Sequence, residues 1–143
     1  MLLAIAAILA FNTFRLKPEP LGKPPAPLPV DAAAVQRLSQ ALQIQTASTE
    51  TASASPEALA AFHAVLERSF PRVHSQLKRE AVAGGSLLYT WPGSDPAAPA
   101  LLLTAHQDVV PIEPGSEGKW SAAPFSGAVA NGFVIGRGAI DDK

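Results

Sequence analysis

The sequence contains no cysteine among its 143 residues. Disulfide bonds, a thiolate nucleophile and a cysteine zinc site are therefore excluded, and the composition says nothing about the redox compartment. Any metal ion must be held by aspartate, glutamate or one of only three histidines. A strong net charge is also lacking: the sum is −1, and the eleven lysines and arginines are scattered along the chain. Because a phosphate backbone requires a basic surface, we expect no nucleic-acid partner.

A long apolar run is lacking as well. The run at the N-terminus, MLLAIAAILAFNTF, is shorter than the roughly twenty residues of a transmembrane helix. A positive charge before it and a clear cleavage site, both typical of signal peptides, are missing. Residues 15–30 are rich in proline and predict an extended spacer, which argues against a core helix before it. We interpret residues 1–14 as a signal peptide or membrane anchor and residues 15–30 as a linker, with an extracytoplasmic protein beyond them.

Residues 31–143 are interpreted as folded, and they begin with helix signals. Asp31 precedes a run with helical apolar spacing, which predicts an amphipathic helix over residues 31–44. Ser55 followed by Pro56 is typical of a helix start, since serine caps the helix and proline fits its first turn. Pro71 is expected either to end this second helix or to restart it as a shorter one.

The pattern then changes to one that predicts strands. Residues 81–91 (AVAGGSLLYTW) and 100–106 (ALLLTAH) are interpreted as two strands, separated by a turn-rich stretch. The second is apolar on both faces, which is typical of a central strand in a covered sheet. Asn131 and Gly132 lie between two short alternating runs and predict a hairpin. Helices followed by strands indicate an α/β fold with a mixed sheet flanked by helices.

Two groups of residues could carry chemistry. His106 lies at the C-terminal end of the expected central strand, where sites of open α/β sheets are found. Asp108, two residues later, falls on the same side of an extended chain, so the pair could serve as a metal ligand and its orienting group. Residues 136–143 (GRGAIDDK) contain the adjacent aspartates Asp141 and Asp142, and carboxylates are zinc ligands. Neither group is specific when taken alone.

Together the motifs are specific. HQDVVP at residues 106–111, Trp120, PFSG at residues 124–127 and GRGAIDDK follow one another in a fixed order. In this order they resemble the di-zinc aminoacylase and carboxypeptidase family. The similarity is greatest to its carboxypeptidase S-like branch, which includes secreted N-fatty-acyl-amino-acid hydrolases. The resemblance implies that residues 31–143 are the N-terminal portion of a zinc-exopeptidase catalytic domain.

The resemblance also assigns roles to individual residues. It implies that His106 ligates one zinc, that Asp108 orients this histidine, and that Asp141 bridges two zinc ions. Asp142 is not implied as a ligand, but the family implies a cis peptide bond between Asp141 and Asp142. The implied reaction is hydrolysis of an amide bond next to a free carboxylate, in a peptide or an N-acyl amino acid.

The family's other metal ligands and its glutamate general base lie downstream of the bridging aspartate. We therefore interpret the chain as an N-terminal fragment that is inactive alone, because one histidine and one bridging carboxylate are too few protein ligands for zinc. A homodimer is expected through a domain that these residues do not include.

Other residues invite a functional interpretation with less support. His63 and His74 are expected to be ordinary packing or surface residues. Trp120 and Phe125 are expected to pack the loop against the sheet edge rather than to bind substrate. Arg137 is expected in a structural ion pair, and a role in binding a substrate carboxylate is the weaker alternative.

Two other functions compete with the hydrolase. The first is a non-catalytic, membrane-tethered module that keeps part of the fold without the site. The second is an unrelated α/β binding domain, which would require four motifs to match in the correct order by chance.

Overall fold

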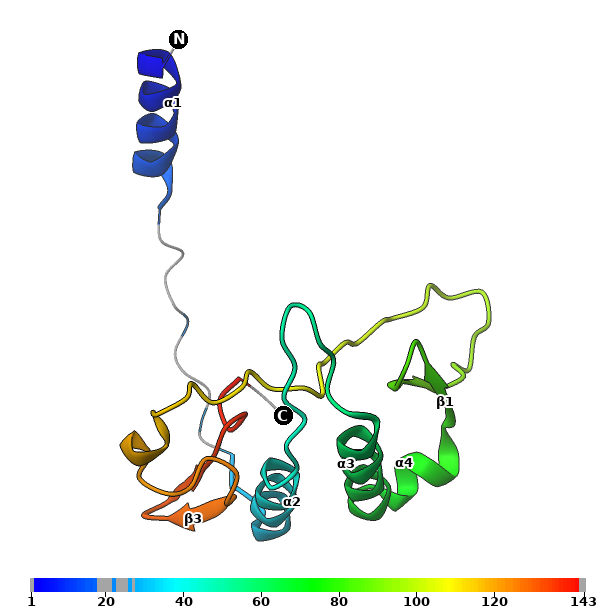
Figure 1. The fold of residues 1–143 in the computed structure, drawn as a ribbon. Helices are drawn as coiled ribbons and strands as arrows, with labels where there is room; N and C mark the ends of the chain where they lie inside the picture. The colour runs from blue at the N-terminus through cyan, green and yellow to red at the C-terminus, as the bar shows by residue number, and fades with distance from the viewer. Residues whose placement is uncertain (1, 18–21, 23–25, 27, 142–143) are drawn as a thin grey trace.

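The computed structural model describes residues 2–17, 22, 26 and 28–141, and Figure 1 shows its ribbon. The helices and strands follow one another in chain order. They are α1 (Leu2–Arg15), α2 (Ala32–Leu42), α3 (Pro56–Ser69), α4 (Pro71–Gln76), β1 (Lys78–Val82), β2 (Ser86–Thr90), the 3₁₀ helix η1 (Glu117–Lys119), β3 (Ala128–Ala130) and β4 (Phe133–Ile135). Helices and strands thus both contribute, and the expected α/β class is confirmed.

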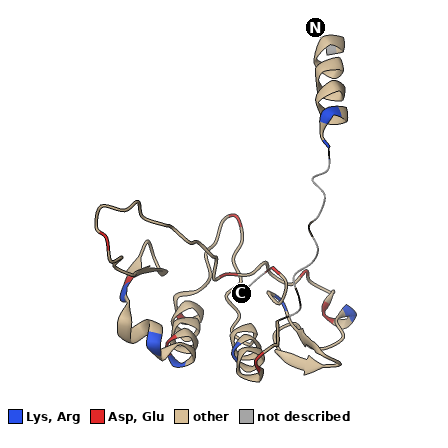
Figure 2. Ribbon diagram, turned by 180° about the vertical axis from the view of Figure 1, so that it is seen from behind, with Lys and Arg blue, Asp and Glu red and all other residues tan. Residues whose placement is uncertain are grey.

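Helix α1 lies away from all other elements. Its described side chains are exposed, and its basic residue Arg15 lies at its C-terminal end, with Lys17 just beyond (Figure 2). Within the part of the chain that the structure describes, no helix is both long and apolar enough to cross a membrane.

The predicted helix starts are confirmed by their hydrogen bonds. The Asp31 carboxylate accepts a bond from the Ala33 backbone N–H at 2.9 Å and so caps α2. The Ser55 hydroxyl accepts one from the Ala58 N–H at 3.1 Å and caps α3, with proline in the first turn. Helix α3 ends at Ser69, and a proline then begins the shorter α4.

The described core lies between α2 and α3, which pack side by side. Leu42 of α2 is completely buried, and Phe62 and Val65 of α3 are nearly so. Both helices place apolar residues three or four positions apart, so each presents one apolar face to the other. Helices α2 and α3 thus support the loops that form the candidate functional site.

The prediction of one strand over residues 81–91 is wrong. The segment is divided between β1 and β2, which pair antiparallel from Lys78 with Thr90 to Val82 with Ser86. Gly84 and Gly85 form the turn at positive φ, a conformation that glycine adopts without a steric penalty. The two glycines that interrupt the apolar pattern are therefore a chain reversal.

The prediction of a central strand over residues 100–106 is also wrong for this structure. The segment is extended but belongs to no strand, and the side chains of Leu101, Leu102 and Leu103 are 75–85% exposed. Among the described residues no strand lies beside it to accept its backbone hydrogen bonds. Pairing begins three residues after the segment, where Val109 forms a parallel bridge with Ala47.

The predicted hairpin at Asn131 and Gly132 is confirmed. Both residues have positive φ, 52° and 82°, and they connect the antiparallel strands β3 and β4. The hairpin region is fastened to α2, because the Ser39 hydroxyl donates a 2.6 Å bond to the Gly127 carbonyl. This contact places the chain that follows β4 near the loop that follows α2.

Candidate metal centre

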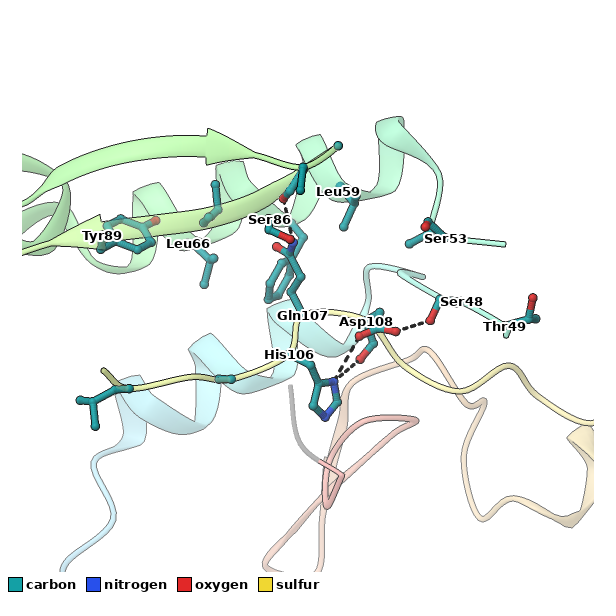
Figure 3. Close-up of a pocket in the computed structure, with 18 residues that line it drawn as sticks. Ser48, Thr49, Ser53, Leu59, Leu66, Ser86, Tyr89, His106, Gln107 and Asp108 are labelled. Atoms are coloured by element: carbon teal, nitrogen blue, oxygen red, sulfur yellow. Dashed lines mark hydrogen bonds and ion pairs between the residues drawn. The ribbon is translucent and has the colours of Figure 1, made fainter. Parts of the chain in front are cut away.

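The segment from His106 to Asp108 is extended, so its side chains alternate in direction. Gln107 points toward α3 and the β1–β2 turn, whereas His106 points to the opposite side (Figure 3). This alternation gives the segment one anchored side and one side that faces the C-terminal part of the chain.

Gln107 anchors the segment. Its side-chain amide donates a 2.8 Å bond to the Gly85 carbonyl, and its Oε1 lies 2.9 Å from His63 Nε2, which therefore acts as the donor. The hydroxyl of the fully buried Thr46 donates a 2.7 Å bond to the Gln107 carbonyl. The middle residue of the motif is thus tied to a helix, a hairpin turn and a loop. No sequence pattern indicates these contacts of Gln107, Thr46 and His63.

His106 is oriented by Asp108. The imidazole Nδ1 donates a 2.8 Å bond to the Asp108 backbone carbonyl, and the carboxylate Oδ1 lies 3.4 Å from the same nitrogen. The carbonyl, followed by the negative charges of Asp108 and Asp141, raises the pKa of His106 above its ordinary value. The structure thus places Asp108 beside His106. The backbone carbonyl of Asp108 lies closer to the imidazole than its carboxylate does.

The Asp108 carboxylate has a partner of its own. Its Oδ2 accepts a hydrogen bond from the Ser48 hydroxyl in the loop after α2 (Figure 3). This bond favours the charged carboxylate and lowers the pKa of Asp108 below its ordinary value. No sequence motif marks Ser48 as part of this site.

The structure also brings Asp141 to the site. Its Oδ1 lies 3.6 Å from His106 Nε2, the ring nitrogen opposite the one that binds Asp108. A turn after β4 delivers it, with Gly138 at a φ of 92°. The expected cis bond after Asp141 lies outside the described residues.

The chemistry of this donor pair fits zinc. In a tetrahedral site with zinc bonds of about 2.0–2.1 Å, two ligand atoms lie about 3.3 Å apart. The Nε2 and Oδ1 atoms are separated by 3.6 Å, so only a small adjustment would let His106 and Asp141 share one ion. In the part of the chain that the structure describes, no three histidine or carboxylate side chains converge enough to hold a metal. The described residues therefore supply two metal-ligand atoms, which is not a complete set of ligands for a metal ion.

His106 and Asp108 lie at the edge of a cleft of about 730 Å³. Apolar side chains of α3 and β2 form one wall, and hydroxyl groups of the loop after α2 form another part of its rim (Figure 3). The labelled wall and rim residues are Leu59, Leu66, Tyr89, Ser48, Thr49 and Ser53. The cleft is wide enough to admit a small molecule to the histidine.

The remaining candidates make structural contacts. His74 shares a 2.8 Å hydrogen bond with the Tyr89 hydroxyl, as expected for a packing residue. Arg137 was expected in an ion pair, but no described carboxylate lies within salt-bridge distance of it. Its guanidinium instead lies over the half-buried Trp120 ring, 5.2 Å from the ring centre. Trp120 thus contacts a residue of its own part of the chain, and Phe125 is half-buried.

Comparisons with known proteins agree with these motifs. Residues 102–143 match the model of peptidase family M20/M25/M40, and this range includes all three candidate site residues. The chain is 44% identical over 110 residues to N-fatty-acyl-amino acid synthase/hydrolase PM20D1 of Mus musculus, an alignment that covers 76% of this chain and 21% of that protein. It is 48% identical over 83 residues to carboxypeptidase S of Saccharomyces cerevisiae, covering 57% of this chain and 14% of that protein.

Residues 102–143 are thus similar to peptidase family M20/M25/M40, and the similarity to individual proteins extends further along the chain. The resemblance inferred from HQDVVP and GRGAIDDK is therefore confirmed, and the M20 relatives belong to the branch that the sequence indicated. The chain spans about a fifth of the length of the curated M20 relatives it matches. No solved structure matches it.

Proposed function

We propose that these residues form part of a zinc-dependent amide hydrolase, in which His106 and Asp141 ligate the metal. One observation carries the proposal: two side chains 35 positions apart in the sequence place Nε2 and Oδ1 3.6 Å from each other. Both lie in the segment that matches the peptidase family. Asp141 would serve as a ligand shared by two zinc ions, and His106 as a ligand of one of them.

The proposed reaction is hydrolysis of an amide bond next to a free carboxylate, which releases an amino acid from a peptide or an N-acyl amino acid. The printed names of the relatives support both substrate classes, since one is a carboxypeptidase and another an N-fatty-acyl-amino acid synthase/hydrolase. Zinc, when bound, would polarise the carbonyl oxygen and make water more acidic. Asp108 would hold His106 Nδ1 and so keep Nε2 directed at the metal.

We expect the 143 residues alone to lack activity. A structural or catalytic zinc ion takes at least three protein ligands, and the described pair provides two. Hydrolysis also needs a general base, which the proposal places outside these residues, together with the remaining ligands. Dimer formation through a further domain is part of the same proposal, and the molar mass of the natural protein in solution tests it.

The proposal is tested in the natural protein that contains these residues. His106→Ala and Asp141→Ala should each reduce the bound zinc and lower amidase activity by more than about a hundredfold, since loss of a group that only orients a ligand already costs about 10–100-fold. His74→Ala and Asp95→Ala are matched controls outside the site, and they should retain activity. Full activity in the first two variants would refute the site assignment. A natural protein that binds no zinc and cleaves no amide would instead support the non-catalytic, membrane-tethered module.

We infer that α1 attaches the protein to a membrane or directs its export. Exposed apolar side chains, among them Leu3 and Phe14, cover the helix, and its segment carries no acidic residue. The Thr13 hydroxyl donates a 2.9 Å bond to the Leu9 carbonyl, which satisfies this polar group within the helix.

Flotation with vesicles tests this attachment, together with fractionation of the source cells. The natural protein should float with anionic vesicles, and a form lacking residues 1–17 should not. Equal flotation of both forms, or a cytoplasmic location, would contradict the inference.

A further inference from the structure

A loop far away in the sequence holds the candidate metal-binding segment in place. The Val109 N–H donates a 3.0 Å bond to the Thr46 carbonyl, and the Ser48 N–H donates one of 3.0 Å to the Val109 carbonyl. These backbone bonds form a short parallel bridge between the loop after α2 and the residues after His106. The bridge brings the Ser48 side chain directly to the Asp108 carboxylate.

The two oxygens of Asp108 then have different neighbours. Oδ2 accepts the hydrogen bond from Ser48, while Oδ1 lies 3.4 Å from His106 Nδ1. A carboxylate can rotate about its last bond, and a donor on one oxygen restricts this rotation. Figure 3 shows the sequence of contacts from Ser48 through Asp108 to His106.

We propose that Ser48 is a positioning residue for the metal centre. Its hydroxyl fixes the Asp108 carboxylate, which keeps His106 Nδ1 occupied and Nε2 directed toward Asp141. The contacts themselves are independent of any metal, whereas the consequence for zinc rests on the proposed function. Ser48 lies outside the sequence motif HQDVVP, 60 positions before Asp108 in the chain.

A purely structural role predicts a different pattern of effects. The backbone bonds of Ser48 do not involve its side chain, so they survive replacement by alanine. The Asp108 side chain is 43% exposed, and water can therefore replace the lost donor without a large cost to folding. What water does not replace is the fixed direction of the donor. We therefore expect Ser48→Ala to change the metal centre while leaving the fold intact.

Zinc-loaded natural protein provides the first test. Ser48→Ala should weaken zinc binding about tenfold, the lower end of the effect of removing a group that orients a metal ligand. kcat should fall while KM changes little, and the visible absorption of the Co(II)-substituted protein should shift. Ser48→Thr keeps the hydroxyl and should restore all three values. Ser75 lies outside the cleft and donates its hydroxyl bond to the Arg72 carbonyl within α4, so Ser75→Ala is the matched control.

The metal-free natural protein provides the second test, with ¹⁵N-labelled histidine and ¹³C-labelled aspartate. In Ser48→Ala, the ring-nitrogen signals of His106 and the carboxyl signal of Asp108 should move, and Ser48→Thr should return them. Unchanged signals would overturn the proposal. If the wild-type protein binds neither zinc nor Co(II), the proposed function fails, while these signals still decide the role of Ser48.

Discussion

Gly127 is the position where a single added methyl group should harm the fold most. Its φ is +59°, and a Cβ atom built there would lie 2.2 Å from the Ser39 carbonyl oxygen of α2. A real Cβ atom does not approach a carbonyl oxygen this closely, so the backbone of the hairpin or of α2 must move. That movement would break the 2.6 Å bond from the buried Ser39 hydroxyl to the Gly127 carbonyl.

The expected cost of Gly127→Ala has three parts. The left-handed conformation costs about 1 kcal/mol for a residue with a Cβ atom. Relief of the steric overlap costs about 1–3 kcal/mol, and a stranded buried hydroxyl costs a similar amount. Together they predict a loss of about 3–7 kcal/mol in the free energy of unfolding, a large share of the stability of a domain.

Urea unfolding of the natural protein, followed by circular dichroism, measures this loss. With a slope of about 2 kcal/mol per molar urea, the midpoint of the affected transition should fall by about 1.5–3.5 M. Gly132 also has positive φ, but nothing lies within 4 Å of its added Cβ. Gly132→Ala should therefore lose only about 1 kcal/mol. Ser39→Ala removes the hydrogen bond without the overlap, and it should fall between the two. Equal losses at Gly127 and Gly132 would refute the steric argument.

Three further predictions concern the loop, the first cap and the metal. Thr46→Val should lower the free energy of unfolding by about 1–2 kcal/mol in thermal melts, because it leaves the Gln107 carbonyl unpaired; an unchanged melting temperature would contradict this. Asp31→Ala should lose about 1 kcal/mol of stability and Asp31→Asn much less, since asparagine also caps a helix. Zinc requires a neutral imidazole, and the Asp108 carbonyl raises the pKa of His106. Zinc binding should thus weaken progressively as the pH falls through that raised pKa, and calorimetry that shows equal affinity at pH 8 and pH 5 would contradict the assigned ligand.

Part of the candidate site could be predicted from the sequence because it is local. His106 and Asp108 are two positions apart, and an extended chain places them on one side wherever the segment lies. The family motif added Asp141, and the fold then placed it 3.6 Å from His106. The tertiary structure also showed that a backbone carbonyl makes the shorter contact to the histidine, which side-chain reasoning did not anticipate.

The supporting residues of the site could not be predicted in this way. Thr46, Ser48 and His63 reach the segment from 44 to 61 positions away, and each is a common polar residue without a distinctive pattern. Their roles depend on how the loop after α2 and helix α3 are packed. Sequence spacing contains no information on such contacts.

The fold shows the same difference between local features and features that depend on tertiary contacts. The sequence by itself determined the helix caps at Asp31 and Ser55 and the turn at Asn131, because these depend on a few neighbouring residues and their backbone preferences. The single strand predicted over residues 81–91 is instead two strands that pair with each other across the turn at Gly84 and Gly85. The strand predicted over residues 100–106 failed because no described strand accepts its hydrogen bonds. Only the tertiary structure decided which segments pair, and with that which oxygen, hydroxyl and amide groups surround His106.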